Sequence, residues 1–260
     1  MDVMRDRFWL WGHEAGSHNE SYGLPAPSRV TPTEAAFYLG IPNLIMVSYH
    51  GKPVPPFGQY AAPFRPLKQV VWSIVGAGGV TQEEERSHVF DLASGLPNLT
   101  GVMMDDFFNR TTENVGVMSA EDLRQLRSRL AINGRTLDLW VVLYDHQLAL
   151  PVEDHLAHCD KLSFWTWKAP DLERLEQNFA RVEELSPSTS KVLGCYMWDY
   201  GQSQSMPLEL MARQCDLGLR WLRAGRIDGM IFLASCICDL DLEAVEWTRD
   251  WIAAIGDQRL

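Results

Sequence analysis

The chain contains the stretch Leu99-Thr100-Gly101-Val102-Met103-Met104-Asp105-Asp106-Phe107-Phe108-Asn109, an apolar run that leads directly into two adjacent carboxylates. This pattern is typical of a parallel strand that leaves a buried core and ends at a functional site. Side chains alternate along a strand, so Asp105, in phase with Gly101 and Met103, is expected to face the interior. Asp106 is then expected to support Asp105 or to cap the following segment. The alternative is that both acids are loop residues, one capping a helix and one solvated.

Eight apolar segments of this kind alternate with segments of helical spacing. The expected strands cover residues 8–11, 43–50, 69–75, 99–104, 137–144, 161–168, 191–201 and 227–234. Alternation at intervals of about 30 residues is typical of βαβ units with right-handed crossovers. The sequence therefore predicts an α/β protein, a single (β/α)8 TIM barrel over residues 1–260. An open, doubly wound sheet would have fewer strands and a glycine-rich nucleotide turn.

Three helix starts carry capping signals. Thr31 stands three residues before Glu34, and Ser119 stands three residues before Asp122, which predicts a capping box at each place. Thr81 precedes a run of glutamates and is expected to cap a helix over residues 81–92.

Composition restricts the class of partner. The net charge of -11 argues against nucleic-acid binding, which relies on clustered Lys and Arg. The charged start leads directly into a strand, so no secretory signal is expected, and no stretch approaches the roughly 18 apolar residues of a membrane span. A cytoplasmic protein is expected, or a secreted one if a leader has been removed. The five cysteines lack C-x-x-C spacing, which argues against a disulfide framework or a zinc ribbon.

Polar and aromatic residues follow most of the expected strands, where the active site of a barrel lies. They are His13, Glu14, His18, Asn19, Tyr49, His50, Asp105, Asp106, Tyr144, Asp145, His146, Trp165, Trp167, Lys168, Trp198, Asp199 and Tyr200. Aromatic faces beside carboxylates suit a sugar, because pyranose C–H groups stack on rings while acids bind hydroxyls and act on the glycosidic bond. The sequence therefore predicts a carbohydrate substrate and a glycoside hydrolase that needs no cofactor.

Glycoside hydrolysis needs one protonated carboxyl group and one ionised carboxylate. Asp105 and Asp199 are the preferred catalytic pair, and Glu14 and Asp106 are the reserves. The remaining residues of the set are expected to bind substrate, with Tyr49, His50 and Tyr144 contacting hydroxyls or tuning the pKa values of the acids.

The segment from Gly101 to Asp106 resembles the fourth strand of (β/α)8 glycoside hydrolases of the endo-α-galactosaminidase and spherulin-like group. In that group a D-G-V-hydrophobic-hydrophobic-D-[DE] stretch delivers acids to the barrel mouth, and the resemblance implies that Asp105 is a catalytic acid. The segment is more distantly similar to the chitinase-like D-x-x-D-x-D-x-E strand. Met103 replaces one acid of that motif and Phe107 stands in place of its catalytic Glu, which argues against substrate-assisted chemistry.

Two other functions remain open. The His, Glu and Asp residues of the set could bind Zn²⁺ or Mn²⁺ and perform a hydrolysis or an isomerisation. Against this, the sequence around His13, Glu14 and His18 is not H-E-x-x-H. The second alternative is a barrel that binds a saccharide without cleaving it, because a fold does not imply a function.

Overall fold

Eight parallel strands close into a barrel in the computed structural model, which describes residues 3–108 and 115–260. Asn109, the last residue of the stretch that ends in the two acids, lies outside the described residues. The barrel strands are β1 (Phe8–Gly12), β2 (Asn43–Met46), β3 (Gln69–Val75), β4 (Leu99–Met104), β7 (Asp138–Tyr144), β8 (Lys161–Trp165), β9 (Ser190–Tyr196) and β12 (Gly229–Leu233). Strand β1 pairs with both β2 and β12 and so closes the ring. The predicted (β/α)8 fold is confirmed.

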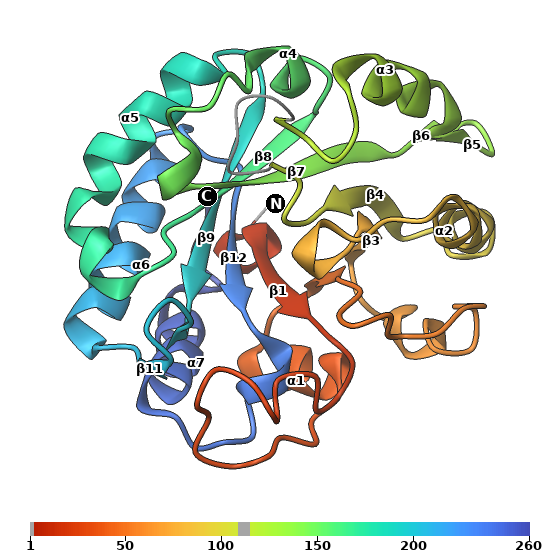
Figure 1. Cartoon of the computed structure of the whole chain (residues 1–260). Helices are drawn as coiled ribbons and strands as arrows, with labels where there is room; N and C mark the ends of the chain where they lie inside the picture. Colours follow the sequence, from red (N-terminus) through yellow and green to blue (C-terminus); the bar gives the residue numbers. More distant parts are fainter. Residues whose placement is uncertain (1–2, 109–114) are drawn as a thin grey trace.

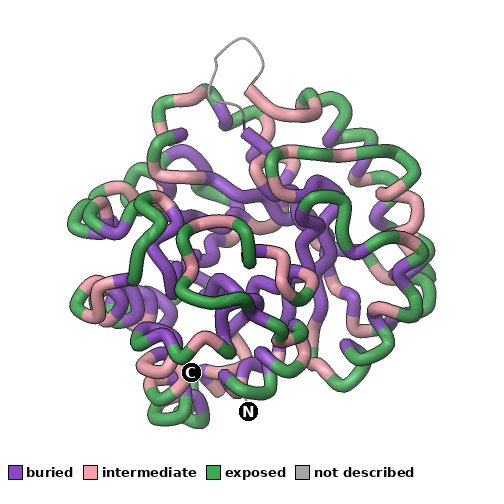
Figure 2. Tube along the Cα trace, turned by 60° about the horizontal axis from the view of Figure 1, so that its bottom comes forward, coloured by how far each residue is buried: buried purple, intermediate pink, exposed green. Residues whose placement is uncertain are grey.

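The helices surround the strands (Figure 1). They are α1 (Pro32–Leu39), α2 (Glu83–Gly95), α3 (Ala120–Arg129), α4 (Glu153–Leu156), α5 (Leu175–Leu185), α6 (Leu208–Arg223) and α7 (Glu243–Ile255). Two small hairpins lie outside the barrel, β5 (Ala131–Ile132) with β6 (Arg135–Thr136), and β10 (Trp198–Asp199) with β11 (Gln204–Ser205). The buried segments are concentrated in the middle of the molecule, and the exposed ones lie mainly in the outer loops and helices (Figure 2). No helix in the described part of the chain is long and apolar enough to cross a membrane.

Local signals position two of the helices as expected. The capping boxes at Thr31 and Ser119 are both present, so these two predictions are confirmed. The predicted cap at Thr81 is wrong, because the helix begins at Glu83 after an N-cap at Gln82. The Thr81 hydroxyl instead donates to the carbonyl oxygen of Ile74, 2.7 Å away, and so binds the end of β3.

Tryptophan side chains fill the barrel interior in layers. The rings of Trp9 and Trp140 lie 5.0 Å apart, and those of Trp11 and Trp165 lie 5.3 Å apart, both pairs edge to face. Glycine makes room for them: a Cβ on Gly194 would lie 2.0 Å from the ring of Trp165. The interior of the barrel is therefore a packed core, and the barrel cavity lies at the carboxyl ends of the strands.

Three strands end earlier than the sequence predicted. Strand β2 stops at Met46, β8 at Trp165 and β9 at Tyr196, whereas continuous apolar and aromatic residues favoured ends at 50, 168 and 201. Beyond these points the chain turns: His50 has a positive φ of 49°, and the residues after β9 form the β10–β11 hairpin. The extra residues therefore belong to loops at the barrel mouth.

Candidate active site

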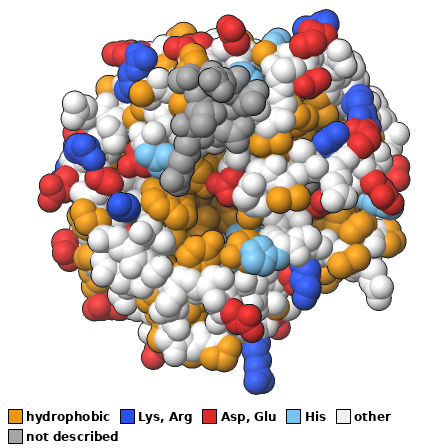
Figure 3. Space-filling model, in the orientation of Figure 1, with side chains coloured by type: hydrophobic (Ala, Val, Ile, Leu, Met, Phe, Trp, Pro, Cys, Tyr) orange, Lys and Arg blue, Asp and Glu red, His pale blue; other side chains and the backbone are white. Residues whose placement is uncertain are grey.

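The carboxyl ends of the barrel strands surround a small cavity of about 60 Å³. A ligand site of this kind is expected at this end of a (β/α)8 barrel. Its lining is mostly aromatic and consists of Trp11, His13, His18, Tyr22, Tyr49, Ala77, Asp105, Asp106, Tyr144, Trp165, Trp167, Tyr196, Tyr200 and Leu233. The space-filling view has a hollow near the middle of one face with mostly hydrophobic walls (Figure 3). We call the space enclosed by these residues the mouth cavity.

Both acids at the end of β4 line the mouth cavity. The strand ends at Met104, and Asp106 takes a positive φ of 45°, so the alternation of side chains stops before it reaches the pair. The expectation that only one of the two acids faces the interior is therefore wrong. A left-handed residue directly after a strand turns the chain, and here it brings both carboxyl groups to one space.

The two carboxyl groups have different surroundings. Asp105 is 5 % exposed, and its Oδ1 atom accepts a hydrogen bond of 2.9 Å from the backbone N–H of Asp106. The Asp106 carboxylate is partly exposed and accepts hydrogen bonds of 2.7 Å from the Tyr144 hydroxyl and from the backbone N–H of Gly78. Burial, together with the charge of Asp106, raises the pKa of Asp105 well above its usual range. Asp105 therefore keeps its proton at pH values where an ordinary aspartate has lost it.

The two histidines of the cavity are held neutral. The Nε2 atom of His13 accepts from the Trp11 indole N–H at 3.1 Å, so its Nδ1–H donates to the Val47 carbonyl oxygen at 3.0 Å. Burial lowers the pKa of His13 to about 4. Burial and the nearby charge of His13 lower the pKa of His18 to about 2, and its Nδ1 lies 3.2 Å from the Tyr200 hydroxyl. These rings therefore contribute shape and hydrogen bonds and carry no charge.

The alternative of a metal site finds no support in the geometry of the described residues. Within residues 3–108 and 115–260, no group of three or more His, Cys, Asp or Glu side chains is arranged to hold an ion. Both ring nitrogens of His13 already have protein partners, and the Nδ1 atom of His18 faces a hydroxyl.

The structure adds cavity residues that the sequence analysis did not select. Tyr196 is the last residue of β9 and lies in phase with Gly194, so strand periodicity could have identified it. Tyr22 comes from the loop between β1 and α1 and has a positive φ of 61°, a conformation that no sequence pattern signalled. Its hydroxyl lies 3.4 Å from that of Tyr49. Burial raises the pKa values of the Tyr22 and Tyr196 hydroxyls, so both stay protonated.

Asp199 does not line the mouth cavity. It lies in the β10–β11 hairpin, is 1 % exposed, and pairs with Gln204. Its carboxylate accepts hydrogen bonds from Gln202, at 3.1 Å from the backbone N–H and at 2.9 Å from the side-chain amide. The two acids predicted as a catalytic pair therefore do not meet in one cavity, and a catalytic role for Asp199 stays a prediction from the sequence.

Other predicted residues position the loop that carries His18 and Tyr22. The Trp198 indole donates to the carbonyl oxygen of Tyr22 at 2.9 Å. Asn19 bonds both backbone groups of Ser28, at 2.7 Å and 3.0 Å, and so closes the same loop. Glu14 starts this loop outside the cavity lining, where its carbonyl oxygen accepts from the Ser17 hydroxyl.

The remaining predicted residues surround the mouth cavity or lie at its rim. His146 stacks on Tyr144 with ring centroids 5.3 Å apart. The Asp145 carboxylate accepts from the backbone N–H of Trp167 at 3.2 Å, which positions that ring in the wall. His50 stacks on Tyr49 at 4.3 Å, and Lys168 is exposed beside the mouth. Trp165 lines the cavity and is 1 % exposed, since most of the ring belongs to the packed interior.

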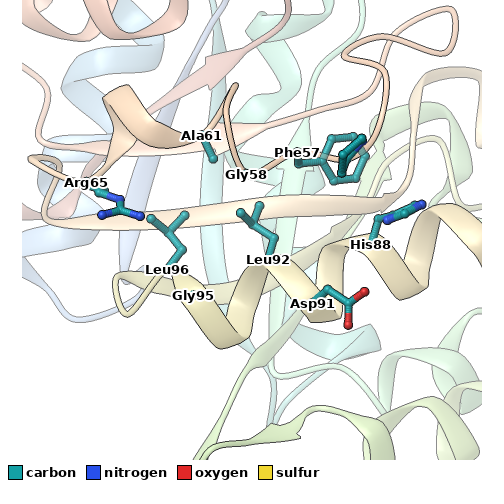
Figure 4. A pocket seen from close by; sticks show the side chains of 10 residues that line it. Phe57, Gly58, Ala61, Arg65, His88, Asp91, Leu92, Gly95 and Leu96 are labelled. Atoms are coloured by element: carbon teal, nitrogen blue, oxygen red, sulfur yellow. The ribbon is translucent and has the colours of Figure 1, made fainter.

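A second and larger hollow, of about 270 Å³, lies on the flank of the barrel beside α2 (Figure 4). Phe57 and Arg65 approach it from the connection between β2 and β3, where the chain forms a short 3-10 helix, Ala62–Phe64. His88 and Leu92 enter from α2. It shares no lining residue with the mouth cavity and contains none of the predicted site residues, so size alone does not identify the functional site.

Comparisons with known proteins support the fold. No protein-family profile and no curated protein sequence matches this chain. Among solved structures it is similar to a chitinase active domain from Pyrococcus furiosus, with 12% identity over 98% of this chain and 90% of that chain and a TM-score of 0.58. It is also similar to a β-mannanase from Alicyclobacillus acidocaldarius, with 11% identity over 98% of both chains and a TM-score of 0.53. Tryptophan synthase from M. tuberculosis matches as well, with 11% identity, coverage of 97% and 94%, and a TM-score of 0.51. At these identities the likeness establishes the (β/α)8 fold, in which glycoside hydrolases recur among the neighbours.

Proposed function

We propose that this protein is a glycoside hydrolase that cleaves a carbohydrate in the mouth cavity, with Asp105 as general acid and Asp106 as its charged partner. The observation that carries the proposal is the pair of adjacent carboxyl groups in unequal surroundings, one deeply buried and one hydrogen-bonded at the cavity surface. Two titratable groups whose surroundings separate their protonation states are typical of an acid and base pair. The glycoside hydrolases among the structural neighbours support the same substrate class.

Each group has a role that follows from its position. Cleavage of a glycosidic bond needs a proton for the leaving oxygen and negative charge near the anomeric carbon, where positive charge develops. Asp105 carries a proton because burial and the charge of Asp106 raise its pKa. Asp106 faces the same cavity, and the Tyr144 hydroxyl and the Gly78 N–H hold its carboxylate in place. The Asp106 carboxylate can therefore stabilise the positive charge at the anomeric carbon or attack that carbon. The sequence resemblance to the endo-α-galactosaminidase and spherulin-like group supports the same role for Asp105.

The experiment compares two leaving groups across a panel of sugars. A nitrophenolate leaves without protonation, whereas a methoxide needs the general acid. Asp105→Asn is expected to slow hydrolysis of the methyl glycoside about 100-fold or more and that of the nitrophenyl glycoside much less. Asp106→Asn is expected to slow both.

Asp138→Asn is the matched control, because Asp138 begins β7 at the opposite end of the barrel. Asp199→Asn, measured in parallel, tests the other pair that the sequence predicted. Equal rates for the wild type and Asp105→Asn on the methyl glycoside would contradict the proposal. Loss of all activity in EDTA would favour the metal mechanism, and binding of sugars without turnover would favour a saccharide-binding barrel.

A further inference from the structure

The described lining of the mouth cavity contains negative charge and no side chain of fixed positive charge. Asp105 and Asp106 line the cavity, and among the described lining residues there is no Lys or Arg. Its two imidazoles cannot supply a cation near neutral pH, since burial lowers the pKa of His13 to about 4 and that of His18 to about 2. The partly exposed carboxylate of Asp106 faces this cavity, so the cavity favours an occupant of opposite sign.

The described hydrogen bonds to this pair come from neutral donors. Asp106 accepts from the Tyr144 hydroxyl and the Gly78 N–H, both at 2.7 Å, and Asp105 accepts from the backbone N–H of Asp106. Burial raises the pKa of Tyr144 well above its usual range, so the hydroxyl stays a neutral donor. These bonds fix the direction of the two carboxyl groups and do not neutralise the charge of Asp106.

The walls of the mouth cavity are aromatic rings set nearly at right angles. Tyr144 and Trp167 have ring centroids 5.8 Å apart at 82°, and Trp167 and Tyr196 lie 6.0 Å apart at 83°. Tyr200 continues this row, with its ring centroid 5.4 Å from that of Tyr196 and 4.9 Å from that of Tyr22. These rings form a continuous aromatic wall, and the faces of aromatic rings attract a cation held within about 6 Å.

We infer that the sugar bound in the mouth cavity carries a protonated, unacylated amino group. This inference rests on the proposed function and names its substrate class. The ammonium group compensates the charge of Asp106 and lies against tyrosine faces, while the C–H groups of the sugar ring pack on the remaining aromatic wall. A neutral hexose leaves the carboxylate without a charged partner. An N-acetylated sugar has lost the positive charge. Both neutral sugars are therefore expected to bind in the mouth cavity more weakly than the free amino sugar.

Binding without turnover tests the inference separately from catalysis. Calorimetric titration of the full chain with glucosamine, glucose and N-acetylglucosamine, and with the three galacto epimers, compares charged and neutral sugars of one shape. Methylammonium is an additional probe that has the charge without the ring. We expect the free amino sugar of at least one epimer to bind at least tenfold more tightly than both of its neutral partners.

Two pairs of variants locate the source of the preference. Asp106→Asn removes the charge and is expected to abolish the preference, whereas Asp138→Asn, at the opposite end of the barrel, is expected to keep it. Tyr22→Leu removes one ring face from a loop outside the barrel strands and is expected to weaken amine binding severalfold. Tyr22→Phe keeps the face and is expected to retain binding, which distinguishes the ring from the hydroxyl.

The inference and the proposed function fail in different ways. Equal or tighter binding of the neutral sugars, or no binding of any amine including methylammonium, would overturn the inference even in a protein that hydrolyses neutral glycosides. A clear amine preference in a protein that hydrolyses no glycoside would support the inference and contradict the hydrolase. A preference that survives Asp106→Asn would also overturn it, because the cation would then lie elsewhere.

Discussion

The ends of β4 and β9 look alike in the sequence and differ in the structure. Each strand runs from apolar residues through an interior glycine towards an aspartate with aromatic neighbours. At the end of β4 a left-handed turn brings Asp105 and Asp106 into the mouth cavity. At the end of β9 the chain enters a hairpin that buries Asp199 against Gln202. An acid after a buried strand is therefore a site residue only if the following turn directs its side chain into the cavity.

The largest expected effect tests the feature that the two strands share, a glycine that makes room for a tryptophan. Gly194→Ala would place a Cβ 2.0 Å from the ring of Trp165, and we expect a loss of about 3 kcal/mol or more in the free energy of unfolding. Gly101→Ala in β4 brings a Cβ to 2.9 Å from the Trp140 indole nitrogen and is expected to cost less. Urea unfolding measures both.

Gly95→Ala at the end of α2 is the control, because a Cβ there meets no atom within 4 Å. If Gly194→Ala costs no more than Gly95→Ala, the interior of the barrel is less tightly packed at β9 than the structure shows.

The second prediction uses a titratable group of the mouth cavity, which Asp105 and Asp106 line and Asp199 does not. Burial lowers the pKa of His13 to about 4 from 6.5, so the unfolded chain binds a proton in this range and the folded protein does not. Stability is therefore lost as the pH falls from 6.5 towards 4, by roughly 1.4 kcal/mol per pH unit and about 3 kcal/mol in total for this group. Unfolding of wild type and His13→Gln at several pH values isolates the contribution. Parallel curves for the two proteins would show that His13 is not held neutral.

The third prediction concerns the donor that holds Asp106. Tyr144→Phe removes the hydroxyl that lies 2.7 Å from the carboxylate. A hydrogen bond to a charged group contributes about 1.5–3 kcal/mol, so we expect a fall in kcat/KM of about 10- to 100-fold. Tyr60→Phe is the control, since Tyr60 packs against Phe64 and Trp72 outside the mouth cavity. An unchanged rate in Tyr144→Phe would remove the hydrogen bond from the mechanism.

The fold was predictable because its signals are local. Apolar periodicity and the capping boxes at Thr31 and Ser119 depend on residues close in sequence, and they identified the barrel and two helix starts. Strand periodicity also pointed to the end of β4 as the place where acids reach the mouth, although the alternation ends at Met104 and both acids line the cavity. Thr81 failed as a cap because its hydroxyl binds the carbonyl oxygen of Ile74, an alternative that the local pattern does not reveal.

The candidate site was only partly predictable because turns and distant contacts complete it. Tyr22 reaches the mouth cavity from a loop that is held by a hydrogen bond from the indole of Trp198. Tyr22 and Trp198 lie far apart in the chain. Asp199, like Asp105, follows an apolar strand in the sequence. Only the hairpin after β9 gives the two acids different positions. Periodicity thus finds the strand that delivers a side chain, whereas the backbone after the strand decides where that side chain lies.

The smallest expected effect tests whether Asp199 belongs to its turn or to the site. Gln202→Ala removes the amide that donates to the buried carboxylate at 2.9 Å, and we expect a loss of about 1 kcal/mol in the free energy of unfolding with kcat/KM unchanged. Gln202→Glu places a second carboxylate beside Asp199 and is expected to lower the free energy of unfolding further. Adding Asp199→Asn to this variant should restore part of the lost stability. Rescue in this double variant would assign Asp199 to the hairpin, because the coupling would lie between the two side chains. A fall in kcat/KM on Gln202→Ala as large as that of Asp105→Asn would instead place the end of β9 in the active site and remove its contrast with β4.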